Sequence, residues 1–173
     1  MDRYKTFTRR FWAGIIDGLV FIPLGFLNIY FSSPARSPVT LVLWAVFFYS
    51  AGWAYSVILH ARYGQTVGKR LMHVKVLDVS EKRLPSLSQA LLRDSGGILL
   101  DLGSLIYFIF LVVKHGYVHR GEYDDSLPEG ILAFASLGWF LLEVFTMLAN
   151  YKRRAFHDLI AKTVVVNLEV PGF

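Results

Sequence analysis

The chain has 173 residues, of which 54% are hydrophobic, 16% aromatic and only 18% charged. Soluble domains average roughly 45–50% apolar and about 25% charged residues, so this composition excludes an ordinary soluble domain and favours one membrane domain over residues 1–173. Cysteine is absent, which excludes disulfides, thiolate metal sites and cysteine nucleophiles, and the formal net charge of +5 must be interpreted from its distribution.

Four long apolar stretches are each close to the roughly 20 residues that a helix needs to cross the hydrocarbon core. A helix also satisfies its own backbone hydrogen bonds, which lipid cannot do. We expect Pro23 to kink the first stretch, because proline removes a backbone donor and clashes with the preceding turn. The predicted spans are Phe11–Phe31, Val39–His60, Gly96–Val113 and Gly130–Ala149.

The loop 61–95 contains the sequence GQTVGKR at Gly64–Arg70. A phosphate-binding P-loop needs four residues between its glycines and Ser or Thr after the lysine, and this segment has neither. We interpret it as a tight turn that holds basic side chains at the lipid headgroups. The sequence LMHVKVL at Leu71–Leu77 is rich in β-branched residues, as is TVVVNL at Thr163–Leu168. Both predict short strands at the inner surface, with a turn at Asp78–Lys82.

Ser86 and Gln89 form a capping-box pattern that predicts a helix start. A helix over Leu87–Lys114 is too long to lie wholly in lipid, so we expect its first two turns along the membrane interface and a bend at Gly96–Gly97. The fold class is therefore an all-α membrane protein, in which four transmembrane helices carry a small cytoplasmic cap of short β-strands and an interfacial helix.

His115 and His119 are four residues apart, but Gly116 and the composition predict a loop there, and no third metal ligand follows. The sequence contains no arrangement of nucleophile, base and acid that would support catalysis. We expect no metal, no cofactor and no enzyme activity.

The basic residues orient the spans. All Lys and Arg residues except Arg36, Lys114 and Arg120 lie before the first span, between the second and third, or after the fourth. The positive-inside rule therefore predicts cytoplasmic termini in a multi-pass protein of the cell membrane. The opposite loop, His115–Glu129, is acidic through Glu122, Asp124, Asp125 and Glu129. Topology and anionic lipid at the cytoplasmic face thus account for the positive charge, and nucleic acid is not an expected partner.

Asp17, Asp101 and Glu143 are acids within apolar runs. Each costs about 2.5–3.5 kcal/mol to insert, and such residues usually face the interior of a bundle. Their distances from the nearest basic residues place all three roughly 10–14 Å below the inner boundary, at 1.5 Å per residue. They are predicted to share one layer, with Arg10 above Asp17 on one helix face. In the alternative interpretation, each acid pairs with a local counter-charge, Arg10 or Arg93, or with backbone groups. The acids would then only hold the helices together.

The segments RRFWAGIID, GQTVGKRLMHVKVLD, LSQALLRD and KRRAFHDLIAKTVVV, in this order from Arg9 to Val166, resemble the RDD family of small integral membrane proteins. The family is named for one arginine and two aspartates. The resemblance implies that Arg10 and Asp17 are signature residues and that Asp158 is the second aspartate. It also implies a role in transport, including cation/proton exchange, without a settled ligand.

Asp158 has three open interpretations: it caps a short helix, it neutralises Lys152–Arg154, or it reaches Arg10 and links the C-terminal segment to the acidic layer. We expect the protein to transport or exchange a small ion, a cation or proton, at Asp17, Asp101 and Glu143. The transporting unit could be a single chain or a homo-oligomer. The alternative is a membrane scaffold or partner-binding subunit that does not transport.

Overall fold

The computed structural model describes residues 3–33, 35–116 and 126–170 of the chain. Over these residues the chain is helical apart from one small sheet. The elements, in chain order, are α1 (Phe7–Val20), α2 (Ile22–Phe31), α3 (Pro38–Tyr63), α4 (Val67–Leu71), β1 (Val74–Asp78), α5 (Leu87–His115), α6 (Ser126–Ala149), α7 (Phe156–Ile160) and β2 (Thr163–Asn167).

Three helices are long and apolar enough to cross a membrane: α3, α5 and the 130–149 part of α6. Helices α1 and α2 pass the same test together and meet at a 47° bend, so they make a fourth span if the pair is one span. Pro23 is in the first turn of α2, where its missing N–H costs no hydrogen bond, and α1 ends just before it. The predicted kink is confirmed.

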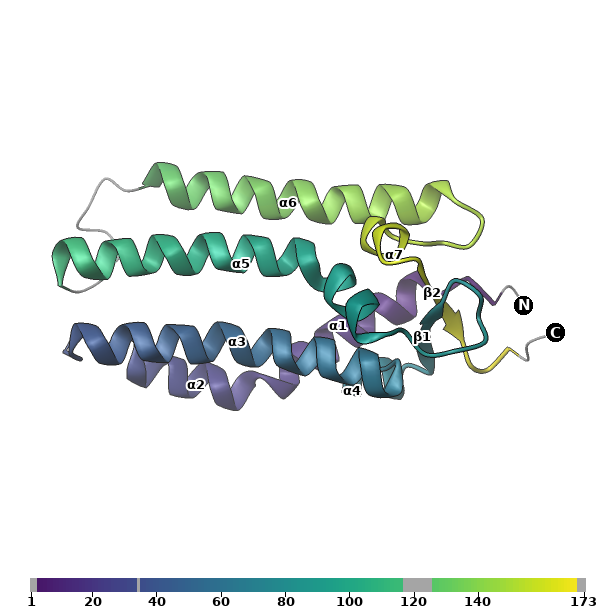
Figure 1. Cartoon of the computed structure of the whole chain (residues 1–173), viewed down its shortest axis with the longest axis horizontal. Coiled ribbons are helices and arrows are strands. Elements are labelled where there is room, and N and C mark those ends of the chain that lie inside the picture. Colours follow the sequence, from purple (N-terminus) through teal and green to yellow (C-terminus); the bar gives the residue numbers. More distant parts are fainter. Residues whose placement is uncertain (1–2, 34, 117–125, 171–173) are drawn as a thin grey trace.

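The long helices lie lengthwise, with α3 and α5 packed against each other, α6 against α5, and α2 against α3 (Figure 1). Their outer surfaces carry large exposed apolar side chains, such as Ile29, Val113 and Phe134, each at least 74% exposed. Such a surface suits lipid rather than water. The first turns of α5 run at an angle to the rest of the helix, as predicted (Figure 1).

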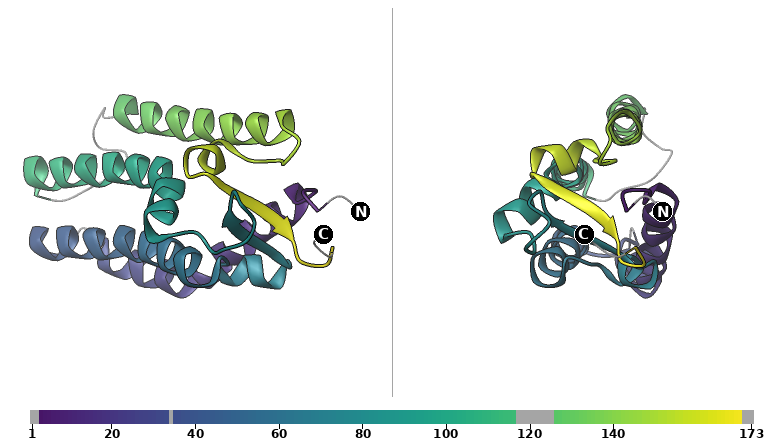
Figure 2. Two further views of the ribbon diagram at one scale, coloured as in Figure 1. Left: turned by 45° about the vertical axis from the view of Figure 1, so that its right-hand side comes forward. Right: turned by 90° about the vertical axis from the view of Figure 1, so that its right-hand side faces the viewer.

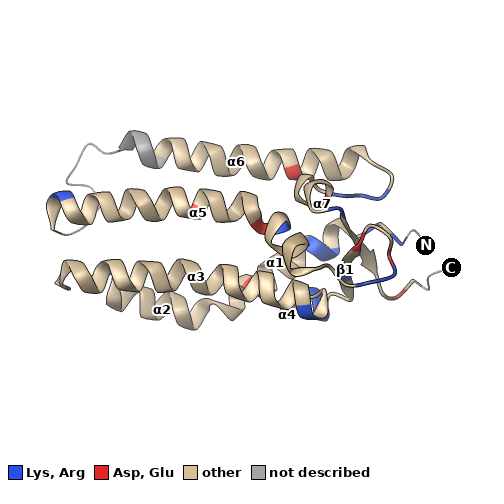
Figure 3. Ribbon diagram, in the orientation of Figure 1, with Lys and Arg blue, Asp and Glu red and all other residues tan. Residues whose placement is uncertain are grey.

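One end of the bundle, which we call the terminal end, carries both termini, α4, α7 and the sheet (Figures 1 and 2). Strands β1 and β2 pair antiparallel, with Val74 opposite Asn167 and Asp78 opposite Thr163. Val74, Val76 and Val165 form the core of this cap. Most Lys and Arg residues also lie at the terminal end (Figure 3).

Three local predictions were wrong. The segment Gly64–Arg70 is not only a tight turn, because Thr66 caps the short helix α4. The first strand begins at Val74 rather than Leu71, because Leu71 ends α4 and His73 has a φ of 55°, which is incompatible with a strand. His115 is the last residue of α5 rather than a loop residue, and Gly116 caps that helix with a φ of +74°. His119 and the acids Glu122, Asp124 and Asp125 lie outside the described residues, as does the side chain of Glu129.

Candidate functional site

Asp17 holds the GQTVGKR segment against α1. Its carboxylate accepts hydrogen bonds from the Tyr55 hydroxyl (2.7 Å), the Thr66 hydroxyl (2.6 Å) and the Gly68 backbone N–H (2.7 Å). A Cβ at Gly68 would lie 2.1 Å from the carbonyl oxygen of Ala13, so only glycine allows this close approach. The carboxylate is satisfied by neutral donors that lie on α3 and at α4.

Asp158 is the centre of a buried charge network. Its side chain is 0% exposed and pairs with two arginines, Arg10 at 2.9 Å and Arg93 on α5. It also accepts hydrogen bonds from the Ala155 N–H (3.0 Å) and the Thr163 hydroxyl (3.2 Å). Burial disfavours the ionised carboxylate, but the charges of Arg10 and Arg93 outweigh burial and hold the pKa of Asp158 below its usual range.

This network decides between the three interpretations of Asp158. The residue does reach Arg10, and it also caps α7 through the Ala155 N–H. The cations that it neutralises are Arg10 and Arg93, rather than Lys152–Arg154. Arg10 and Asp158, two of the three residues that the sequence resemblance singled out, therefore form an ion pair that joins α1 to α7.

Glu143 of α6 is hydrogen-bonded to His157 of α7, with 2.5 Å between the carboxylate and Nδ1. On the other side of the ring, an Arg10 guanidinium nitrogen lies 3.1 Å from Nε2. A guanidinium can only donate, so Nε2 accepts and Nδ1 carries the hydrogen that is donated to Glu143. Burial lowers the pKa of His157, and the charge of Arg93 lowers it further, which favours this neutral ring.

A cavity of about 430 Å³ lies between α3, α5 and α6. Three acids line it: Asp94, Asp101 and Glu143. Asp101 accepts a hydrogen bond from the Trp53 indole at 2.9 Å. One carboxylate oxygen of Asp94 is buried without a hydrogen-bond partner among the described residues, and His60 Nδ1 lies 3.8 Å from it.

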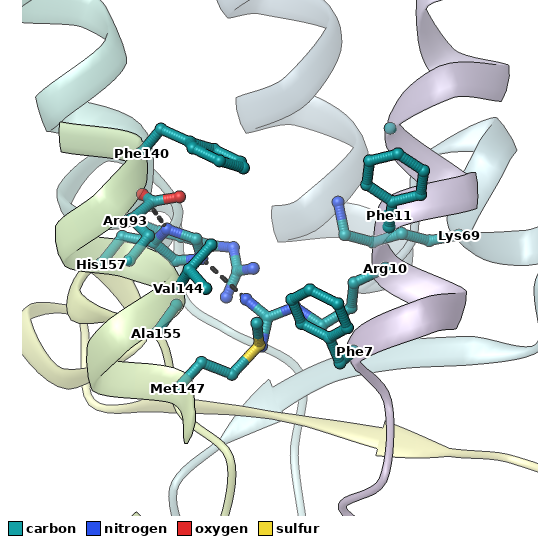
Figure 4. Close-up of a pocket in the computed structure, with 12 residues that line it drawn as sticks. Phe7, Arg10, Phe11, Lys69, Arg93, Phe140, Val144, Met147, Ala155 and His157 are labelled. Atoms are coloured by element: carbon teal, nitrogen blue, oxygen red, sulfur yellow. Dashed lines mark hydrogen bonds and ion pairs between the residues drawn. The ribbon is translucent and has the colours of Figure 1, made fainter. Parts of the chain in front are cut away.

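A second cavity, of about 200 Å³, lies at the terminal end between α1 and α6 (Figure 4). Its polar lining comes from Arg10, Lys69, Arg93, Glu143 and His157. Arg93, Glu143 and His157 line both cavities. The Glu143–His157 pair thus lies where the two cavities adjoin.

The predicted acidic layer is therefore present only in part. Asp101 and Glu143 face one cavity, but the contacts of Asp17 within residues 3–116 and 126–170 include neither acid and do not include Arg10. Arg93, expected as a counter-charge for the intramembrane acids, pairs with Asp158 instead. No group of three or more His, Asp and Glu side chains in the described part of the chain could hold a metal ion.

Sequence reasoning missed three residues of this site: Asp94, His157 as the partner of Glu143, and Lys69 as a cavity residue. Asp94 follows Arg93 and lies only seven residues before Asp101, a spacing that returns to the same helix face and could have indicated it. Nothing in the sequence indicates that α7 folds back against α6.

The apolar spans, the cap at the terminal end and the buried ionisable network define a multi-pass helical membrane protein. A family model matches residues 4–162, almost the whole chain, and its description is the RDD family. The chain belongs to the RDD family. Comparisons with curated proteins and with solved structures found no match.

Proposed function

We propose that this RDD-family protein exchanges a small cation for protons across the cell membrane, with Glu143 and His157 as the exchange pair. The observation that carries the proposal is that this pair lines both cavities, one reaching among α3, α5 and α6 and the other opening at the terminal end. Ionisable groups within membrane spans are costly, and they usually mark ion pathways.

The acids of the larger cavity supply the attraction for a cation. Asp94, Asp101 and Glu143 face one space, and one oxygen of Asp94 has no hydrogen-bond partner among the described residues. The carboxylates do not form a compact ligand set, so a cation there would keep part of its hydration. A monovalent cation suits such a site better than a tightly coordinated divalent one.

Competition between cation and proton provides the exchange. A proton on Glu143 removes the negative charge that attracts a cation, and a proton on His157 places a positive charge at the same point. The cavity therefore holds a cation or a proton, and each displaces the other. In this proposal Asp17 is a structural residue and does not bind the cation. Its carboxylate already accepts three hydrogen bonds from neutral donors, and these bonds hold the segment that carries Lys69.

The positive-inside rule supports a cytoplasmic terminal end, because most Lys and Arg residues lie there (Figure 3). The smaller cavity would then open toward the cytoplasm, in a cell membrane. Both cavities lie within one chain, so the proposal does not require a homo-oligomer. It assigns the protein no enzyme activity.

The test compares proton flux from liposomes that contain wild-type protein or the Glu143→Gln variant, with a cation gradient as the driving force. Glutamine keeps the shape and can still accept a hydrogen bond from His157, but it cannot take up a proton. We expect flux to fall about 10²-fold or more, the usual loss when a positioned proton-transfer group is removed.

The matched control is Glu169→Gln, which removes a carboxylate that is half exposed and lines neither cavity. The control should retain wild-type flux. A folded Glu143→Gln protein with undiminished flux would contradict the proposal. Absence of flux from wild-type protein, together with a stable co-purifying protein, would favour the scaffold alternative.

A further inference from the structure

The smaller cavity has two chemically different parts. Its walls are apolar and come from α1 and α6, through Phe7 and Phe11 on one side and Phe140, Val144 and Met147 on the other (Figure 4). Its inner surface carries the cations Arg10, Lys69 and Arg93. A ligand that fits both parts has an anionic group attached to an apolar body.

The three cations of this cavity differ in their partners. Arg10 and Arg93 share one carboxylate, that of Asp158. Glu143, the acid in the lining, is hydrogen-bonded to His157 and also attracts Arg10. The side-chain amine of Lys69 makes no hydrogen bond or ion pair in the part of the chain that the structure describes, and it points into the cavity (Figure 4).

Four charged groups surround Lys69: Arg93 and Arg10 repel its ammonium, and Asp17 and Asp94 attract it. Burial, with the two arginines, outweighs the two acids and lowers the pKa of Lys69 to about 8. The surroundings of this amine thus disfavour a further positive charge. An anion in the cavity would relieve that repulsion.

The cavity also opens toward the surface that faces lipid. Phe11 is 52% exposed and Phe140 is 53% exposed, so both rings line the cavity and also lie on the outer surface of the bundle. A volume of about 200 Å³ is below the roughly 300 Å³ of a cavity for a drug-sized molecule, so a whole lipid does not fit. A headgroup phosphate could enter while its acyl chains lie outside against the rings.

We propose that the cavity between α1 and α6 binds the phosphate of an acidic phospholipid, with Lys69 as the cation free to pair with it and Arg10 and Arg93 as supporting charges. The apolar walls favour a membrane lipid over a free anion, because only the lipid covers the exposed rings. This cavity is also lined by Glu143 and His157 of the proposed exchange. The tests remain separate, because one measures lipid binding and the other measures flux.

The test measures binding of phosphatidylglycerol and of phosphatidylcholine to the purified, full-length protein in mixed micelles. Wild-type protein should prefer phosphatidylglycerol. The Lys69→Gln variant should bind it about fivefold more weakly, the usual weight of one lysine at an anionic lipid surface. The matched control, Lys82→Gln, removes an exposed charge at the same end and should change binding less than twofold.

A second experiment compares wild-type protein with the Lys69→Arg variant, which keeps a positive charge at this position. Phosphatidylglycerol binding by wild-type protein should weaken as the pH rises above about 8, because the free amine of Lys69 loses its proton there. The Lys69→Arg variant should keep its affinity, since arginine stays charged.

Three results would overturn the proposal. The first is equal binding of the two lipids by wild-type protein. The second is equal loss of binding in the Lys69→Gln and Lys82→Gln variants. The third is displacement of phosphatidylglycerol by inorganic phosphate at similar concentration, which would make a free anion the ligand instead of a lipid.

Discussion

The Asp158→Asn variant tests the buried network most severely. Asp158 accepts from two guanidinium groups, one backbone N–H and one hydroxyl, and no part of its side chain is exposed. An asparagine has a single acceptor oxygen, and its NH₂ group must face a donor. The substitution also removes the carboxylate that Arg10 and Arg93 share.

The expected cost follows from two losses. Removing one partner of a buried ion pair typically costs about 3–5 kcal/mol, because the other charge remains buried. Loss of the hydrogen bond to the Ala155 N–H, which caps α7, adds about 1 kcal/mol. Full burial means that solvent does not screen the interaction. The total is a large share of the roughly 5–15 kcal/mol that stabilises a typical folded domain.

The assay is unfolding of the purified protein in mixed micelles by a denaturing detergent, followed by circular dichroism. The Glu169→Gln variant is the control, since its ion pair with Arg9 is half exposed, and it should unfold close to wild type. A double-mutant cycle adds specificity: Arg10→Met and Asp158→Asn should be coupled by about 0.5–3 kcal/mol, while Arg10→Met and Asp17→Asn should be additive. Wild-type stability of Asp158→Asn, or coupling of Arg10 to Asp17 instead, would refute the reasoning.

Three further predictions concern packing and pH. Gly68→Ala should lower the free energy of unfolding by about 1–3 kcal/mol, because the new Cβ would lie 2.1 Å from the Ala13 carbonyl oxygen. Gly18→Ala is the control, since a Cβ there meets open space and should leave stability unchanged. Equal melting temperatures of the two variants would contradict this prediction. Gly96→Ala should separate α5 from α6, because its Cβ would lie 2.0 Å from the Trp139 ring, and unchanged indole fluorescence would argue against it. The pKa of His157 is lower in the folded than in the unfolded protein, so stability should fall as the pH drops through about 6.5. In melting curves, the stability of the His157→Gln variant should depend less on pH in this range. An unchanged pH dependence would mean that other groups cause it.

Much of the fold could be predicted because its signals are local. The apolar length of the spans, the capping box at Ser86 and Gln89, and the β-branched run of β2 each act within one element. The capping box is present with both of its hydrogen bonds, and the break before Pro23 follows from the chemistry of the proline ring.

The partners of the charged residues could not be predicted in the same way. Helix periodicity places Arg10 on the face of Asp17, but its partner is Asp158, which approaches from α7 at the other end of the sequence. Counting residues from the inner boundary placed Asp101 and Glu143 in one layer, and both residues line one cavity. The same reasoning was wrong for the contacts of Asp17. The segment after α3 folds back onto α1, and Thr66 and Gly68 donate hydrogen bonds to Asp17, which its depth along the helix does not predict.

The measurement that tests the central claim most directly is the internal pH of liposomes that contain wild-type protein. A monovalent cation gradient is imposed across the membrane, and its direction is then reversed. Exchange of a cation for protons predicts that the internal pH changes with one gradient, changes in the opposite sense with the other, and stays constant with Glu143→Gln. An internal pH that follows the time course of protein-free liposomes under both gradients would contradict the account.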